Sequence, residues 1–107
     1  MNALFICSRN QWRSPTAELV FRRYPNVQTR SAGTSPNARR TVSAADIAWA
    51  DNVFAMEQKH KNRLSAQFPR ALRHKEIIVL DIPDDYRYMD EDLIGILKES
   101  VEHYLPK

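Results

Sequence analysis

The segment Ala3–Pro15 reads ALFICSRNQWRSP, and it decides how the rest of the chain is interpreted. Its first residues, Ala3 to Ile6, form a short apolar run that is typical of a buried β-strand ending at Cys7. A polar stretch follows. Ser14-Pro15 is then typical of a helix start, with a hydroxyl at the N-cap and proline at the first helical position. The segment therefore predicts a strand, a loop and a helix in immediate succession.

The rest of the chain repeats this alternation. Further strands are expected at Val27–Thr29, Asn52–Met56 and Ile77–Leu80, and further helices at Ser43–Trp49, at His60–Phe68 and from the N-cap Asp90 to Tyr104. The composition of 31–37 and 81–90 indicates loops, whereas the aliphatic run 77–80 indicates a strand buried on both faces. This order predicts an α/β fold, a single domain over residues 1–107 with a four-stranded parallel sheet and helices on both faces.

Composition limits the classes of function. The chain has 107 residues, of which 43% are hydrophobic and 27% charged, which is typical of a globular domain. The single cysteine, Cys7, cannot form an intramolecular disulfide or a cysteine-rich zinc site. No apolar run is long enough for a membrane span or a secretory signal, so we expect a cytoplasmic protein with no membrane partner. A net charge of +3 favours anions, but the basic residues are scattered, which argues against a nucleic-acid partner.

Five residues separate Cys7 from Arg13, and this spacing suits a phosphate-binding loop. A loop of this length between a strand and a helix can wrap its backbone N–H groups around an anion, at the positive end of the helix dipole. The same field favours a nucleophilic thiolate at Cys7, while the Arg13 guanidinium offers a planar fork for two phosphoryl oxygens. We interpret Cys7 and Arg13 as catalytic and the intervening loop as substrate-binding. The substrate-binding candidates are Ser8, Arg9, Asn10, Gln11, Trp12 and Ser14.

Two of these loop residues have a more specific predicted role. The Ser14 hydroxyl can donate a hydrogen bond to the sulfur, and the Asn10 side chain can form hydrogen bonds within the loop.

No metal-ligand spacing connects the histidines of the chain, so neither a metal nor a cofactor is expected. His60 lies on an apolar helical face and is expected to pack there, whereas His74 and His103 are expected to be solvated.

The loop resembles that of the low-molecular-weight protein tyrosine phosphatase family, which reads Cys-x-Gly-Asn-x-Cys-Arg-Ser-Pro. The matching residues are Cys7, Asn10, Arg13, Ser14 and Pro15. Further similarity extends over most of the chain, at Ser31-Ala32-Gly33-Thr34, at Ala38-Arg39 and from Ala50-Asp51 to Met56. The resemblance implies a phosphatase loop between the first strand and the first helix. It also implies a phosphomonoester hydrolase of the tyrosine phosphatase type, which acts through a cysteinyl-phosphate on a phosphorylated protein or small phosphate ester and releases inorganic phosphate.

Three departures from the family pattern affect the expected site. Arg9 replaces the loop glycine, so the backbone there must be one that a residue with a side chain can adopt. Trp12 replaces the second cysteine, which removes a thiol that could protect Cys7 by a reversible disulfide. The region between Asn37 and Asp51 is much shorter than in typical members, so one wall of the substrate cleft can be missing.

The general acid is expected in the acidic loop after the last predicted strand. In the family an aspartate directly before a proline protonates the leaving oxygen, whereas here the loop reads Asp81-Ile82-Pro83-Asp84-Asp85. Because Asp81 ends the predicted strand, at the edge of the sheet where Cys7 is expected, we predict Asp81 as the catalytic acid, with Asp84 and Asp85 as alternatives.

Aromatic side chains close to the loop provide candidate walls for the substrate. Tyr86, Tyr88 and Trp12 could flank an aromatic phosphoester by stacking, and partial burial is the alternative explanation for each of them.

Two other classes of function stay open. An arsenate reductase on the same fold needs further cysteines to pass on a disulfide, so an external thiol would have to replace them here. A non-catalytic phosphate- or nucleic-acid-binding module would keep the loop without turnover. Hydrolysis of a generic phosphoester separates this module from a phosphatase.

Overall fold

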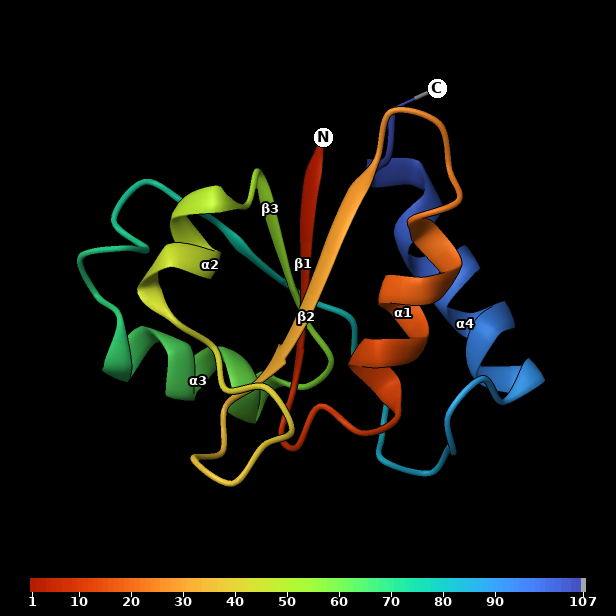
Figure 1. The fold of residues 1–107 in the computed structure, drawn as a ribbon, viewed down its shortest axis with the longest axis horizontal. Coiled ribbons are helices and arrows are strands. Elements are labelled where there is room, and N and C mark those ends of the chain that lie inside the picture. Colours follow the sequence, from red (N-terminus) through yellow and green to blue (C-terminus); the bar gives the residue numbers. More distant parts are fainter. Residues whose placement is uncertain (107) are drawn as a thin grey trace.

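A parallel sheet of four strands lies at the centre of the protein. The structure is a computed structural model that describes residues 1–106. The strands are β1 (Asn2–Cys7), β2 (Gln28–Gly33), β3 (Asn52–Ala55) and β4 (Ile77–Val79). They pair in the order β2-β1-β3-β4, and all pairs are parallel (Figure 1). The predicted α/β fold class is therefore confirmed.

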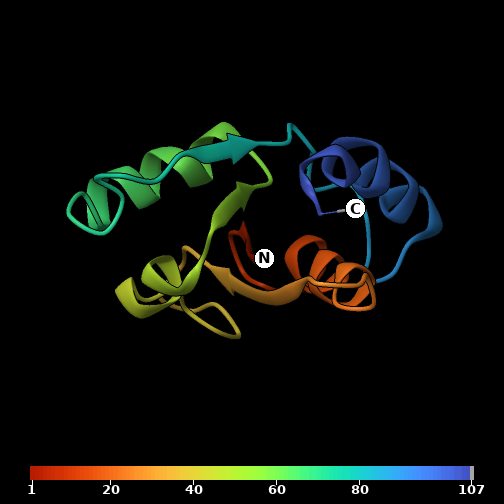
Figure 2. The same cartoon turned by 90° about the horizontal axis from the view of Figure 1, so that it is seen from above.

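Helices cover both faces of this sheet. Seen from above, α1 (Arg13–Phe21) and α4 (Glu91–Val101) lie together on one side, and α2 (Ala44–Trp49) and α3 (Gln58–Gln67) lie on the other (Figure 2). A short 3₁₀ helix, Glu102–Tyr104, follows α4. Each face has its own buried apolar cluster, so the sheet separates two halves of the core.

The strand that is buried on both faces is β1, not β4. The β1 side chains alternate, because Phe5 and Cys7 belong to the α1–α4 cluster whereas Leu4 and Ile6 belong to the α2–α3 cluster. Phe5 also stacks on aromatic rings of α1 and β3. By contrast, β4 is an edge strand whose residues 78 and 79 are only half-buried. The prediction of a doubly buried strand at 77–80 is wrong, because an aliphatic run does not reveal strand order.

The second strand extends into the predicted loop. β2 continues through Ser31 to Gly33, because it pairs with β1 in a register that places Gly33 beside Cys7. A Cβ atom at Gly33 would lie 2.4 Å from the Ser8 carbonyl oxygen, so only glycine permits this approach. Thr34 N–H also donates to the Cys7 carbonyl oxygen. The end of β2 thus supports the polypeptide that follows Cys7.

Of the two helix N-caps predicted from the sequence, Asp90 is confirmed and Ser14 is not. Asp90 caps α4 by accepting hydrogen bonds from two backbone N–H groups, and Ser43 caps α2. At α1 the prediction is wrong, since the helix begins at Arg13 and its N-cap, Trp12, makes no side-chain cap. The Ser14 hydroxyl, predicted to cap the helix, bonds instead to side chains of the loop. Among the described residues, no helix is long and apolar enough to cross a membrane.

Candidate active site

The polypeptide between β1 and α1, residues 8–12, forms an open loop at the carboxyl end of the central strand. Asn10 adopts a left-handed conformation with a φ of 57°, which asparagine tolerates. Arg9 has no positive φ, so the replacement of the family glycine needs no strained backbone. Within residues 1–106, no backbone N–H of this loop donates a hydrogen bond to a protein acceptor. These amides are therefore available to an anion.

Cys7 lies at the base of the loop and is 3% exposed. Its Sγ is 3.0 Å from the Ser14 hydroxyl, as the sequence predicted for a donor to the sulfur. The Asn10 side-chain amide donates to Ser14 Oγ and to Ser31 Oγ, each at 2.9 Å. From the other side of the loop, Arg39 Nε donates to the Asn10 carbonyl oxygen at 3.1 Å. The loop is therefore held by α1, by β2 and by the segment after β2.

Arg13 is buried beside the loop, with 2% of its surface exposed. One guanidinium nitrogen, Nη1, donates to the Ile82 carbonyl oxygen at 2.8 Å and pairs with the Glu57 carboxylate. The Nε atom lies 3.6 Å from Asp84 Oδ1. Burial alone would raise the pKa of Glu57, but the hydrogen bond and charge of Arg13 outweigh it and lower that pKa. The guanidinium is thus fixed by partners from two other segments of the chain.

His60 supports the loop from beneath. Its Nδ1 accepts the Glu57 backbone N–H at 3.0 Å, so the ring proton of the neutral histidine lies on Nε2, which is 2.9 Å from Ser8 Oγ. Burial and the nearby Arg13 charge lower the pKa of His60 to about 4. The packing role predicted for His60 is confirmed by its burial, and the hydrogen bond to Ser8 adds a function that the sequence did not reveal.

The neutral, buried His60 makes the free energy of unfolding depend on pH. Its folded pKa of about 4 lies below the ordinary value of 6.5, so between these values the unfolded chain binds a proton that the folded chain does not. The stabilisation is complete above pH 6.5 and is lost as the pH falls towards 4. We expect a loss of about 3 kcal/mol across this window in urea denaturation. His60→Gln should flatten the dependence, and an equally steep loss in that variant would contradict the assignment.

The loop and one acidic residue line a pocket at the carboxyl end of β1. Its lining residues are Cys7, Ser8, Arg9, Gln11, Trp12, Arg13 and Asp84. Asp81, the predicted acid, is not among them; it lines a separate depression with Glu57, Lys59 and Pro83. The reason is the strand order, because β3 lies between β1 and β4 and keeps the end of β4 away from Cys7. The structure therefore brings Asp84, and not Asp81, together with the cysteine loop.

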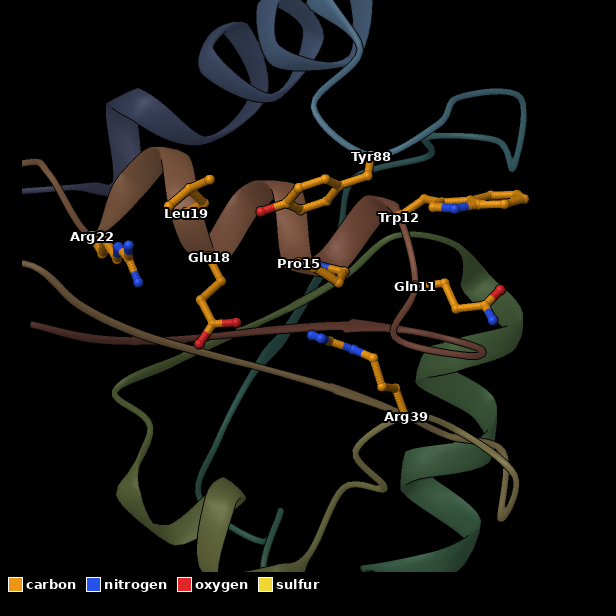
Figure 3. Close-up of a pocket in the computed structure, with 8 residues that line it drawn as sticks. All are labelled: Gln11, Trp12, Pro15, Glu18, Leu19, Arg22, Arg39 and Tyr88. Atoms are coloured by element: carbon orange, nitrogen blue, oxygen red, sulfur yellow. The ribbon is translucent and has the colours of Figure 1, made fainter.

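The three candidate aromatic walls have different positions. Trp12 is 39% exposed and borders the loop pocket, whereas Tyr86 packs against the core between α1 and α4. Tyr88 is half exposed and borders a larger groove of about 610 Å³ that runs along α1 (Figure 3). This groove shares Gln11 and Trp12 with the loop pocket. Among the three aromatic residues, only Trp12 lines the loop pocket.

One charged residue of the site, Glu57, escaped the sequence analysis, as did its contact with His60. Glu57 pairs with Arg13, and its backbone orients His60; both residues lie at the start of α3, far from the loop in sequence. Their spacing, an N-cap residue followed three positions later by a residue that accepts its N–H, is the local signal that links them. Among the described residues, no cluster of three or more His, Cys, Asp or Glu side chains could hold a metal ion.

Comparison with known proteins finds that those similar to this chain are phosphatases. No protein-family model matches the chain. A protein-arginine phosphatase of Bacillus subtilis (strain 168) is 32% identical over 97 aligned residues, which cover 65% of the chain and 65% of that protein. The match thus spans just under two thirds of the relative's length.

Solved structures extend the similarity to nearly the whole chain. The low-molecular-weight protein tyrosine phosphatase of T. tengcongensis superposes with a TM-score of 0.77 at 23% identity, covering 98% of this chain and 99% of that one. YwlE arginine phosphatase, as a cysteine-to-serine mutant with a phosphorylated active-site serine, has a TM-score of 0.74 at 22% identity, covering 96% and 95%. The chain therefore shares the fold of the low-molecular-weight protein tyrosine phosphatases.

Proposed function

We propose that residues 1–107 form a single domain that hydrolyses phosphomonoesters, as a cysteine-dependent enzyme of the protein tyrosine phosphatase type. The observation that carries the proposal is the position of the Cys7 sulfur, 3.0 Å from the Ser14 hydroxyl. It lies at the base of a loop whose amides have no acceptor among the described residues. A phosphoryl group bound by the loop amides would lie against this sulfur. The buried Arg13 adds a guanidinium beside the same pocket.

The reaction follows from these positions in two displacements. The Cys7 thiolate attacks phosphorus, and an S–P bond forms as the bond between phosphorus and the leaving oxygen breaks. The leaving oxygen takes a proton from an aspartic acid. A water molecule then attacks the phosphocysteine, the same aspartate accepts a proton from it, and inorganic phosphate leaves as the thiolate is restored. The loop amides and Arg13 stabilise the charge on the equatorial oxygens in both steps.

We assign the acid to Asp84 rather than to Asp81. Asp84 borders the pocket that contains Cys7, and its side chain is 57% exposed, so it can reach a leaving group that enters from solvent. It also lies 3.6 Å from Arg13, the residue proposed to hold the phosphoryl oxygens. This position supports Asp84 because a general acid must come within hydrogen-bond reach of the atom it protonates.

The substrate is proposed to be a phosphorylated protein. Trp12 borders the loop pocket and can stack on a planar group such as a phenol ring, which supports phosphotyrosine. A guanidinium group is also planar, and the relative from Bacillus subtilis is a protein-arginine phosphatase, so phosphoarginine is the second candidate. The proposed reaction needs Cys7 in its reduced form, which a reducing compartment maintains, and this supports a cytoplasmic location.

Steady-state hydrolysis of an aryl phosphate in the presence of a chelator tests the proposed function. We expect turnover without added metal, together with a phosphocysteine that rapid acid quench and peptide mapping locate at Cys7. Peptides carrying phosphotyrosine or phosphoarginine, compared by kcat/KM, then distinguish the two candidate substrates. A chain that binds phosphate and hydrolyses none of these compounds would instead be a non-catalytic phosphate-binding module.

Replacing Arg13 tests the proposed guanidinium fork. We expect Arg13→Lys to be nearly as damaging as Arg13→Ala, with kcat lowered by about 100-fold or more, since a point charge cannot hold two phosphoryl oxygens and the Glu57 and Ile82 partners together. The measurement is kcat on an aryl phosphate, with Arg63→Lys as an exposed control. If lysine restores most of the activity, Arg13 acts by simple charge neutralisation.

A further inference from the structure

Glu18 lies on α1, outside the loop pocket, and nothing in the proposed reaction uses it. Its side chain lines the groove along α1, which Arg39 and Tyr88 also line (Figure 3). One carboxylate oxygen, Oε1, lies 2.6 Å from the hydroxyl of Ser31 on β2. A glutamate carboxylate has no proton to donate, so the Ser31 hydroxyl must donate to it. This short contact therefore fixes the direction of one hydrogen bond.

The direction of that bond determines the next two. Because the single Ser31 proton points to Glu18, Ser31 Oγ can only accept from Asn10, which donates through Nδ2 at 2.9 Å. The second proton of the same Nδ2 group goes to Ser14 Oγ, also at 2.9 Å. Ser14 accepts there, so its own proton is available to Cys7 Sγ at 3.0 Å. A continuous chain of oriented hydrogen bonds joins the Glu18 carboxylate to the sulfur.

The orientation of the Asn10 amide is the step at which this chain could reverse. Its Oδ1 atom is buried and has no hydrogen-bond partner among the described residues. Turning the amide over would let Oδ1 accept from both hydroxyls, and Ser14 would then direct its proton to Asn10 instead of to the sulfur. With Ser31 committed to Glu18, the turned amide would place Oδ1 against an oxygen that has no proton to give. Glu18 thereby excludes the alternative.

We propose that Glu18 is a positioning residue for the Cys7 thiolate, which it reaches through Ser31, Asn10 and Ser14 by fixing which partner donates in each bond. The proposal rests on the proposed role of Cys7 as a thiolate nucleophile. According to the proposal, Glu18 stabilises the Cys7 thiolate, although its negative charge alone would destabilise it. A negative charge on its own disfavours a nearby thiolate, whereas the oriented Ser14 proton favours it.

The sign of the effect is the test. The rate of alkylation of Cys7 by iodoacetamide, followed from pH 4 to 9, reports the reactivity of this sulfur without requiring phosphatase turnover. In Glu18→Ala we expect alkylation at acidic pH to become about tenfold slower, the value of one hydrogen bond to a charged acceptor. Glu18→Gln, which keeps the size of the side chain, should lie between wild type and Glu18→Ala. The charged neighbours of Cys7 in its pocket, Arg9, Arg13 and Asp84, stay unchanged in both variants.

Two controls separate the chain of hydrogen bonds from other effects. Glu99→Ala removes an exposed carboxylate from α4 and should leave the rate unchanged. Ser14→Ala should slow this alkylation by itself, and adding Glu18→Ala to it should have no further effect, because the last bond of the chain is already absent. A faster or unchanged alkylation rate in Glu18→Ala would overturn the proposal. Additive effects in the double variant would overturn it as well, whether or not the wild-type protein hydrolyses phosphate esters.

Discussion

Cys7→Ser is expected to abolish hydrolysis of an aryl phosphate, lowering kcat by roughly 10,000-fold or more. The loop amides and the Ser14 hydroxyl that favour a thiolate cannot ionise an alcohol to a useful extent at neutral pH, so serine is a far weaker nucleophile in the same place. Cysteine and serine differ little in size, and Cys7 is buried against the α1–α4 cluster, so we expect the fold to persist.

The control for this variant is phosphate binding rather than turnover. Because the loop and Arg13 are retained, Cys7→Ser should still bind phosphate, and thermal unfolding should show a folded protein. Loss of both turnover and phosphate binding would indicate a damaged loop and would leave the role of the sulfur undetermined, so binding is measured first. Wild-type rates in a folded, phosphate-binding Cys7→Ser protein would eliminate the phosphocysteine mechanism.

The parts of the fold that the sequence predicted are those determined by local pattern. The run from Ala3 to Ile6, the alternation of strands and helices, and the Asp90 cap all follow from apolar periodicity and from hydrogen bonding within a few residues. The end of β2 is different. Ser31 to Gly33 has the composition of a loop, and pairing with the central strand makes it extended. Tertiary pairing overrides local propensity at such a position.

In the site, too, local sequence predicted some features, whereas others depend on tertiary contacts. Cys7, Arg13 and Ser14 come from one continuous segment, so their proximity could be predicted from spacing alone. The partners of that segment lie far away in sequence, and no spacing predicts that Glu57 pairs with Arg13. Strand order, likewise, cannot be predicted from residue spacing. Sequence places three aspartates after the last strand, but it does not show that β3 separates β4 from β1. That strand order keeps Asp81, which lies close to the end of β4, away from Cys7, whereas Asp84, three residues further on, borders the pocket.

Asp84→Asn is therefore expected to have the second large effect, and its size should depend on the substrate. A general acid contributes roughly 100-fold to 10,000-fold when the leaving group carries negative charge poorly. We expect a loss in this range for a phosphotyrosine peptide. A much smaller loss is expected for an aryl phosphate whose phenol has a low pKa. This dependence isolates proton donation from the other role of Asp84, its contact with Arg13 at 3.6 Å, because a weakened phosphate site would slow both substrates alike.

Asp81→Asn and Asp85→Asn are the matched controls for this experiment. Each removes one carboxylate from the same loop and changes the long-range electrostatic field in a similar way, so neither should show the dependence on the leaving group. Asp81 borders a depression with Glu57 and Lys59, whereas Asp84 borders the Cys7 pocket; Pro83 lies between the two aspartates in the sequence. If Asp81→Asn shows the leaving-group dependence and Asp84→Asn does not, the loop must rearrange when substrate binds. The acid would then be the aspartate at the end of β4, since only a movement about Pro83 could bring its carboxylate to the leaving oxygen.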